Sequence, residues 1–124
     1  MKPAGNRPDC LFCRVVAGEI PSTKVIETDD VLAFRDINPA APQHILVIPK
    51  QHLADSLADL ELGDADVAQI WSDLAAVAQR AARSSPDFTD GWRLVTNVGQ
   101  NGGQSVFHLH LHLLAGRRLA WPPG

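Results

Sequence analysis

The 124-residue sequence has no apolar run of the length that a membrane span requires, and it has no cluster of lysines and arginines. The first absence argues against a membrane protein, because a spanning helix needs about 20 consecutive apolar residues. The second absence, together with a net charge of -3, argues against nucleic acid as the main partner. Residues 1–9 are polar and lack the apolar core of a signal peptide. We therefore expect a cytoplasmic protein.

Internal repeats and low-complexity segments are also missing, and a chain of this length suffices for one domain or one protomer of a small oligomer. Hydrophobic residues make up 45% of the sequence, which is enough for an ordinary buried core. We expect residues 1–9 to be a flexible lead-in and residues 10–124 to form the domain.

The period of the apolar residues predicts the secondary structure. Apolar residues recur every three or four positions between Asp64 and Ser84, which predicts one long amphipathic helix, and a short helix is expected over residues 11–18. Strands are predicted over residues 24–27, 31–35, 44–49, 92–98 and 107–114. About five strands, mostly antiparallel, with one long and one short helix indicate an α+β domain.

Three of the five histidines alternate with leucines in the segment Phe107–Leu114. This alternation predicts a strand with His108, His110 and His112 on one face, and with the leucines and Phe107 directed into the core. The outer two imidazoles would lie about 13 Å apart on a flat strand, too far for all three to ligate one ion. The pattern indicates a chemical site in which either two histidines bind zinc, or one acts as nucleophile or base while its neighbours hold an anion.

The only two cysteines, Cys10 and Cys13, form a C-x-x-C motif. In a cytosolic chain this motif is a redox pair or half of a metal site. A third interpretation is that the two reduced thiols simply pack in the core as small apolar groups. The glycine-rich turn at residues 99–105 leads directly into the histidine segment. Such a turn can direct backbone N–H groups at an anion, although Asn-Gly is also a common hairpin signal.

The histidine segment, His-x-His-x-His followed by two apolar residues, resembles the histidine-triad signature. From about Cys10 to the C-terminus the chain is similar to the HINT branch of the HIT superfamily, and the further segments that carry the resemblance are Asp36–Pro39, His44–Lys50, Gly102–Val106 and Trp121–Gly124. Members of that branch are homodimeric purine-nucleotide-binding proteins with an α+β fold, and many hydrolyse nucleoside 5′-phosphoramidates through a covalent nucleotidyl-histidine. For this chain the resemblance implies the same α+β fold, a homodimer, purine nucleotides as ligands and hydrolysis of nucleoside 5′-phosphoramidates.

The resemblance also implies roles for individual residues. His110 would be the nucleophile, His112 would hold a phosphate oxygen and His44 would help to position the triad. Ser105 would lie near the leaving group. The residues implied to bind the nucleotide are Ile20, Phe34, Asp36, Ile37, Asn97, Gly103, Gln104, Ser105, His110 and His112, with Trp121 at the partner subunit's leaving-group site. For Ile20 and Ile37, packing in the core is an alternative.

Some HIT proteins combine a C-x-x-C with a histidine after the Pro-Lys pair and with the first triad histidine. This likeness implies a structural zinc on Cys10, Cys13, His52 and His108, and no metal at the phosphate. Three other functions stay open: hydrolysis of dinucleoside polyphosphates, a nucleotide-binding regulatory or scaffold role, and a metallohydrolase with zinc on His110 and His112. The tail Trp121–Gly124 weighs against the first, and the lack of a nearby carboxylate ligand weighs against the last.

Overall fold

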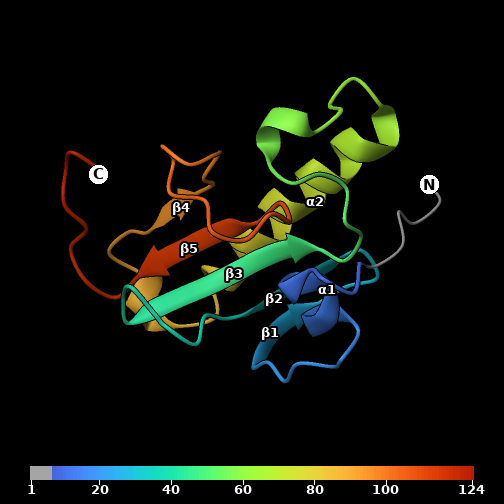
Figure 1. Ribbon diagram of the computed structural model, residues 1–124. Coiled ribbons are helices and arrows are strands. Elements are labelled where there is room, and N and C mark those ends of the chain that lie inside the picture. The colour runs from blue at the N-terminus through green and yellow to red at the C-terminus, as the bar shows by residue number, and fades with distance from the viewer. Residues whose placement is uncertain (1–6) are drawn as a thin grey trace.

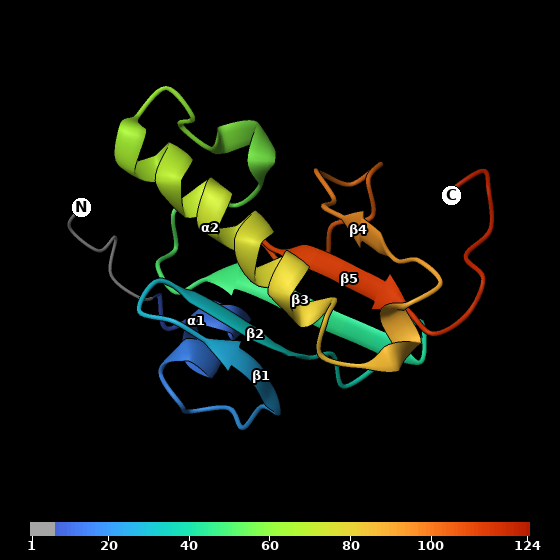
Figure 2. The ribbon, with the colours of Figure 1, turned by 180° about the vertical axis from the view of Figure 1, so that it is seen from behind.

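The computed structural model describes residues 7–124, and in this part of the chain five strands form one antiparallel sheet in the order β1-β2-β3-β5-β4 (Figure 1). The strands are β1 (Lys24–Glu27), β2 (Val31–Arg35), β3 (Gln43–Pro49), β4 (Arg93–Val95) and β5 (Leu111–Ala115). Figure 2 shows the long helix α2 (Ala65–Ala81) crossing one face of this sheet, and the short helix α1 (Leu11–Val16) lies on the opposite face. The α+β prediction is confirmed.

Side-chain caps begin both helices. The Asp64 carboxylate accepts the N–H groups of Asp66 and Val67 at the start of α2, and the Cys10 sulfur accepts the N–H of Cys13 at the start of α1. Two single 3₁₀ turns, Leu57–Asp59 and Pro86–Phe88, were not predicted. None of the helices in residues 7–124 combines the length and the apolar character needed to cross a membrane.

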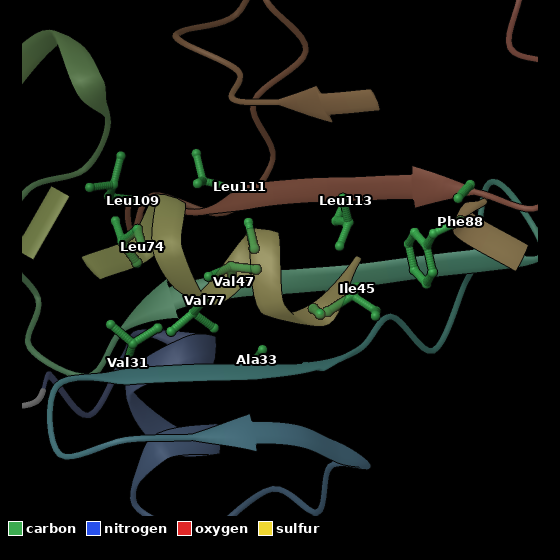
Figure 3. Close-up of a cluster of buried hydrophobic side chains, with 13 residues drawn as sticks. Val31, Ala33, Ile45, Val47, Leu74, Val77, Phe88, Leu109, Leu111 and Leu113 are labelled. Atoms are coloured by element: carbon green, nitrogen blue, oxygen red, sulfur yellow. The ribbon is translucent and has the colours of Figure 1, made fainter. Parts of the chain in front are cut away.

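The central strand β3 separates two buried clusters, which explains its nearly continuous apolar sequence. Between the sheet and α2, residues such as Ile45, Leu74 and Leu113 form the larger cluster (Figure 3). On the other face, Phe34 and Leu46 pack with residues of α1. The side of the sheet that faces α1 is the one that also carries the polar side chains described below.

The structure differs from the predictions at two strands. β4 pairs over only three residues, Arg93–Val95, where seven were expected. β5 begins at Leu111, and Phe107 is 54% exposed, so the expectation that Phe107 enters the core is wrong. Alternation orients only those residues that run as extended chain against a neighbour, and Phe107 precedes this stretch. Of the expected lead-in, residues 1–6 lie outside the described residues, and a turn at 7–9 is closed by the Cys10 N–H on the Arg7 carbonyl oxygen.

Candidate functional site

The sheet register gathers polar side chains from distant parts of the sequence. Phe34 on β2 is the neighbour of Leu46 on β3, and Leu46 is the neighbour of His112 on β5, so these three residues form a row across the sheet. In the next row, the N–H of Asp36 donates to the carbonyl oxygen of His44 at 3.0 Å. Strands pleat with a period of two, and the two rows therefore bring Asp36, His44 and His112 together at one end of the sheet.

A cavity of about 360 Å³ lies between this end of the sheet and α1. Its apolar walls are formed by Leu11, Phe12, Val15, Ile20, Pro21, Phe34, Ile37, Leu46 and Val106. The remaining lining residues are Ser22, Arg35, Asp36, Asn38, Ser105, His110 and His112. An apolar slot with a polar end suits a ligand that joins a flat aromatic group to a charged group.

The ring of His110 has a defined tautomer. It packs edge-on against Phe12, with ring centroids 5.0 Å apart. Its Nδ1 lies 2.7 Å from the carbonyl oxygen of His108. A carbonyl oxygen can only accept, so Nδ1 carries the proton and Nε2 carries the lone pair. His110 therefore brings a nucleophilic or basic nitrogen to the cavity that its ring lines.

A short chain of hydrogen bonds places the proton of His112 on Nε2, whereas that of His110 is on Nδ1. The N–H of Ala40 donates to His44 Nδ1 at 2.9 Å, so the proton of neutral His44 resides on Nε2. This Nε2 lies 2.9 Å from His112 Nδ1 and donates to it. The proton of His112 is consequently on its own Nε2. His112 is thereby a hydrogen-bond donor beside the lone pair of His110, their ring centroids being 4.8 Å apart.

Burial keeps these rings neutral. It is the main cause that lowers the pKa of His112 to about 4, and the neighbouring rings of His110 and His44 add to the effect. Burial also lowers the pKa of His44 and of His110 below the usual histidine value. The Asp36 carboxylate opposes the shift at all three rings without cancelling it. At pH 7 the site therefore contains the Nε2 lone pair of His110 and, beside it, the Nε2–H donor of a neutral His112.

The ligand atoms of Asp36, His44 and His112 lie within 4.8 Å of one another, close enough to meet at a metal ion. For His44 Nε2 to bind a metal, its proton would have to move to Nδ1, where it would oppose the N–H of Ala40. The Asp36 carboxylate already accepts the Asn38 N–H through Oδ1 and places Oδ2 3.5 Å from His44 Nε2. The donor pattern thus favours hydrogen bonding among these three side chains over metal binding.

A second cluster forms where α1 meets the segments that follow β3 and precede β5. Three residues apart at the start of α1, the two cysteines present their sulfurs to the same side. Cys10 Sγ lies 3.3 Å and Cys13 Sγ 3.6 Å from His108 Nδ1, and Cys13 Sγ lies 3.5 Å from His52 Nδ1. All four residues are buried, and their ligand atoms lie within 4.8 Å of one another.

These positions fit a tetrahedral zinc ion. With Zn–S of about 2.3 Å and Zn–N of about 2.0–2.1 Å, tetrahedral angles separate sulfur from nitrogen by about 3.5 Å. The other ring nitrogen of each histidine is a hydrogen-bond donor, as metal binding through Nδ1 requires. His108 Nε2 donates to the Pro49 carbonyl oxygen at 2.8 Å, and His52 Nε2 donates to Asp55 Oδ1 at 3.1 Å. Each bond leaves the Nδ1 lone pair directed at the sulfurs. The predicted set is brought together as a closed, structural type of zinc site.

The structure groups most, but not all, of the residues implied to bind a nucleotide. Ile20, Phe34, Asp36, Ile37, Ser105, His110 and His112 line the cavity, and His44 contacts it through His112. Ile37 is 88% exposed, so core packing is excluded for it, whereas Ile20 is partly buried against the α1 cluster. Asn97, Gly103, Gln104 and Trp121 are not among the residues that line the cavity.

Gln104 and Trp121 have other surroundings in this chain. The amide of Gln104 accepts the N–H of Gly99 and donates to the carbonyl oxygens of Asp55 and Val106, so it braces the glycine-rich turn. Trp121 is 80% exposed on the C-terminal tail, which the guanidinium of Arg93 contacts at the carbonyl oxygen of Ala120. Trp121 thus lies outside the cavity of its own chain, and its place at the partner subunit's leaving-group site stays a prediction.

Several contributors were not predicted. Thr96 donates its hydroxyl to the carbonyl oxygen of His110 at 2.9 Å, and Phe12 supports the His110 ring. Ala40 contributes only backbone atoms, which no motif identifies. Nothing in the sequence pairs Thr96 with a residue 14 positions away.

Comparison with known proteins places this arrangement in context. The profile of the HIT domain matches residues 17–119. A 14 kDa zinc-binding protein from Zea mays is 47% identical over 92% of this chain and 87% of its own length. Adenylylsulfatase HINT1 from Arabidopsis thaliana is 44% identical over 92% of this chain and 76% of its own length. The solved structure of a HIT family hydrolase from Legionella pneumophila Philadelphia 1 shares 46% identity, with a TM-score of 0.85 over 94% of this chain and all of that one.

Proposed function

The chain belongs to the HIT domain family, and from this premise we propose that it hydrolyses purine nucleoside 5′-phosphoramidates through a covalent nucleotidyl-histidine. The observation that carries the proposal is the opposite tautomers of two adjacent rings. His110 exposes a lone pair on Nε2, because its proton is on Nδ1 and is donated to the His108 carbonyl oxygen, and His112 exposes an N–H. A nucleophile beside a donor is what attack on a phosphorus atom requires.

In the first step, His110 Nε2 attacks the α-phosphorus and forms a P–N bond while the bond to the amine breaks. The Nε2 proton of His112 stabilises the charge that grows on a non-bridging oxygen. In the second step, water attacks the same phosphorus, the nucleoside monophosphate is released and His110 regains its lone pair. Two easier displacements thus replace one difficult hydrolysis.

The departing amine needs a proton, because an unprotonated amide anion is a very poor leaving group. Ser105 lines the cavity, and its hydroxyl, or a water that it holds, is the group we assign to this proton transfer. The proton ends on the amine nitrogen as the P–N bond breaks, and the water that attacks in the second step returns a proton to Ser105. Ser105 would thereby matter most for substrates with basic leaving groups.

The apolar part of the cavity is our proposed site for the purine and ribose. Ile20, Phe34 and Ile37 supply apolar contact for a flat base. Asp36 contributes a carboxylate whose oxygens each keep a further lone pair beyond the contacts to Asn38 and His44, and these can accept the ribose hydroxyls. The preference between adenine and guanine does not follow from these contacts.

We further infer that the Cys10, Cys13, His52 and His108 cluster holds one zinc ion with a structural role. When bound, zinc would link α1 to the segment that carries His110, which begins directly after His108. The Zea mays relative is named a zinc-binding protein, in agreement with this assignment. With two thiolates and two imidazoles the coordination is complete, and no step of the reaction uses the metal.

We also propose a homodimer. β4 is one of the two edge strands of the sheet. Leu94 within β4 is 38% exposed, and Trp92 and Val98 on either side of β4 are 44% and 41% exposed. An apolar edge strand is a natural pairing surface for the same strand of a second copy across a two-fold axis. Sedimentation should give a dimer for the wild type and a monomer for Leu94→Lys. Leu62→Lys, which alters an exposed leucine elsewhere, is the control and should remain dimeric.

A second candidate substrate is adenylyl sulfate, because the Arabidopsis relative is named an adenylylsulfatase. Attack by His110 would be the same, but sulfate leaves as a stable anion and needs no proton. Ser105→Ala should therefore lower phosphoramidate hydrolysis while sparing adenylyl sulfate hydrolysis. An equal loss on both substrates would contradict the role of Ser105 as the source of the proton.

The decisive assay supplies a nucleoside phosphoramidate, adenylyl sulfate and a dinucleoside polyphosphate side by side, with EDTA present. We expect the phosphoramidate to give the highest kcat/KM. A higher kcat/KM for the dinucleoside polyphosphate would contradict the proposal and identify dinucleoside polyphosphate hydrolysis as the main activity. Nucleotide binding without turnover of any of the three substrates would favour a regulatory or scaffold role.

A further inference from the structure

Arg117, which follows β5, contacts the loop that carries Ala40. Its Nη2 donates to the carbonyl oxygen of Ala40 at 2.9 Å, across 77 positions of the sequence. Its Nη1 donates to the carbonyl oxygen of Arg118 at 3.0 Å, and this second bond fixes the orientation of the guanidinium plane. The planar guanidinium thereby joins two stretches of backbone, which a single point charge would hold less rigidly.

The neighbouring glycine brings the same two segments into contact. Gly116 has a φ of +95°, and a Cβ at this position would lie 2.7 Å from the Cβ of Pro42. Only a glycine accommodates both the backbone conformation and the close approach. The loop between β2 and β3 is thus held against the residues that follow β5 by a packing contact and by a charged hydrogen bond.

We propose that Arg117 is a positioning residue for the phosphate-binding ring of His112. By holding Ala40, it keeps the Ala40 N–H on His44 Nδ1, and this bond selects the tautomer of His44 that donates to His112. If the loop moves away, His44 can carry its proton on Nδ1 and accept through Nε2. His112 would then donate to His44 from Nδ1 and present a lone pair to the cavity, which would repel a phosphate oxygen.

The tautomers can be measured directly in the free, full-length protein by two-bond ¹H–¹⁵N correlation spectra of the histidine rings. We expect the wild type to show His44 and His112 with their protons on Nε2. In Arg117→Ala both rings should show a mixture of tautomers, and Arg117→Lys, which keeps a donor, should recover most of the wild-type pattern. Arg118→Ala is the matched control, because it removes an adjacent guanidinium and keeps the carbonyl oxygen that Arg117 contacts. It should resemble the wild type.

The catalytic consequence rests on the proposed function. A hydrogen bond from a charged donor is lost, so kcat on the phosphoramidate should fall about 5- to 10-fold in Arg117→Ala, with KM little changed because the base and ribose contacts persist. Unmixed tautomers in Arg117→Ala, or the same mixture in Arg118→Ala, would overturn the proposal. If the wild type hydrolyses no phosphoramidate, the proposed function fails, and the spectra still decide the role of Arg117.

Discussion

Replacing Cys13 by serine should destabilise the fold far more than an ordinary change in a small helix. Through the proposed zinc ion, Cys13 is linked to His52 and His108, which lie 39 and 95 positions away. If the metal acts on the unfolded chain as a covalent cross-link does, closing the shorter loop contributes about 4 kcal/mol. A domain of this size is stable by about 5–15 kcal/mol, so this loss would remove a large share. Tm should fall by about 12–20 °C.

The assay pairs zinc analysis with thermal unfolding of protein prepared with ample zinc. The wild type should contain about one zinc per chain and Cys13→Ser much less. Val15→Ala is the control, because Val15 is a buried residue of the same helix that is not a ligand. It should cost about 1–2 kcal/mol and keep the zinc. Zinc-free wild type, or a Cys13→Ser variant with unchanged Tm, would refute the reasoning and leave the cysteines as packing.

Three further predictions concern the histidine site and the tail. The pKa of His112 is about 4 in the folded chain against 6.5 for an unperturbed histidine, so the folded state binds fewer protons and the free energy of unfolding should fall as the pH drops from 6.5 to 4. Urea unfolding across this range should show a shallower dependence in His112→Asn, and identical profiles would contradict the shift. Thr96→Val removes the hydroxyl bond to the His110 carbonyl oxygen and should cost about 1 kcal/mol in urea unfolding, unlike Thr89→Val, taken as a control on a surface turn. Deleting residues 120–124 should leave the dimer intact in sedimentation but change the ranking of amine leaving groups in kcat/KM; an unaltered ranking would exclude Trp121 from that site.

The sequence patterns predicted the elements well where the apolar period is strong. The strand at Val31–Arg35 and the long helix have the expected bounds or nearly so, because their apolar residues face a continuous core. Phe107 was misplaced because alternation says which residues share a face, but not where pairing with a neighbour begins. β4 was predicted too long for the same reason, since only three of its residues find partners on β5.

The candidate site was predicted less completely. The ligands Cys10, Cys13, His52 and His108 came from resemblance, since residues up to 98 positions apart give no local sign of contact. Ala40, Pro49 and the carbonyl oxygen of His108 act through backbone atoms, which leave no signature in residue identity. Their contacts nevertheless decide which nitrogen of each ring carries a proton. The chemistry of the triad is therefore visible only once the backbone is in place.

The central claim is that His110 becomes covalently nucleotidylated, and one measurement tests it most directly. Wild-type protein is mixed with a nucleoside phosphoramidate, quenched within the first turnover and analysed by intact and peptide mass spectrometry. We predict a nucleoside monophosphate adduct on His110, which His112→Asn should still form, more slowly. His110→Ala should form none and should lose more than the factor of about 10²–10⁴ that removal of a general acid or base costs. An adduct on another residue, or turnover by His110→Ala at the wild-type rate, would contradict the account.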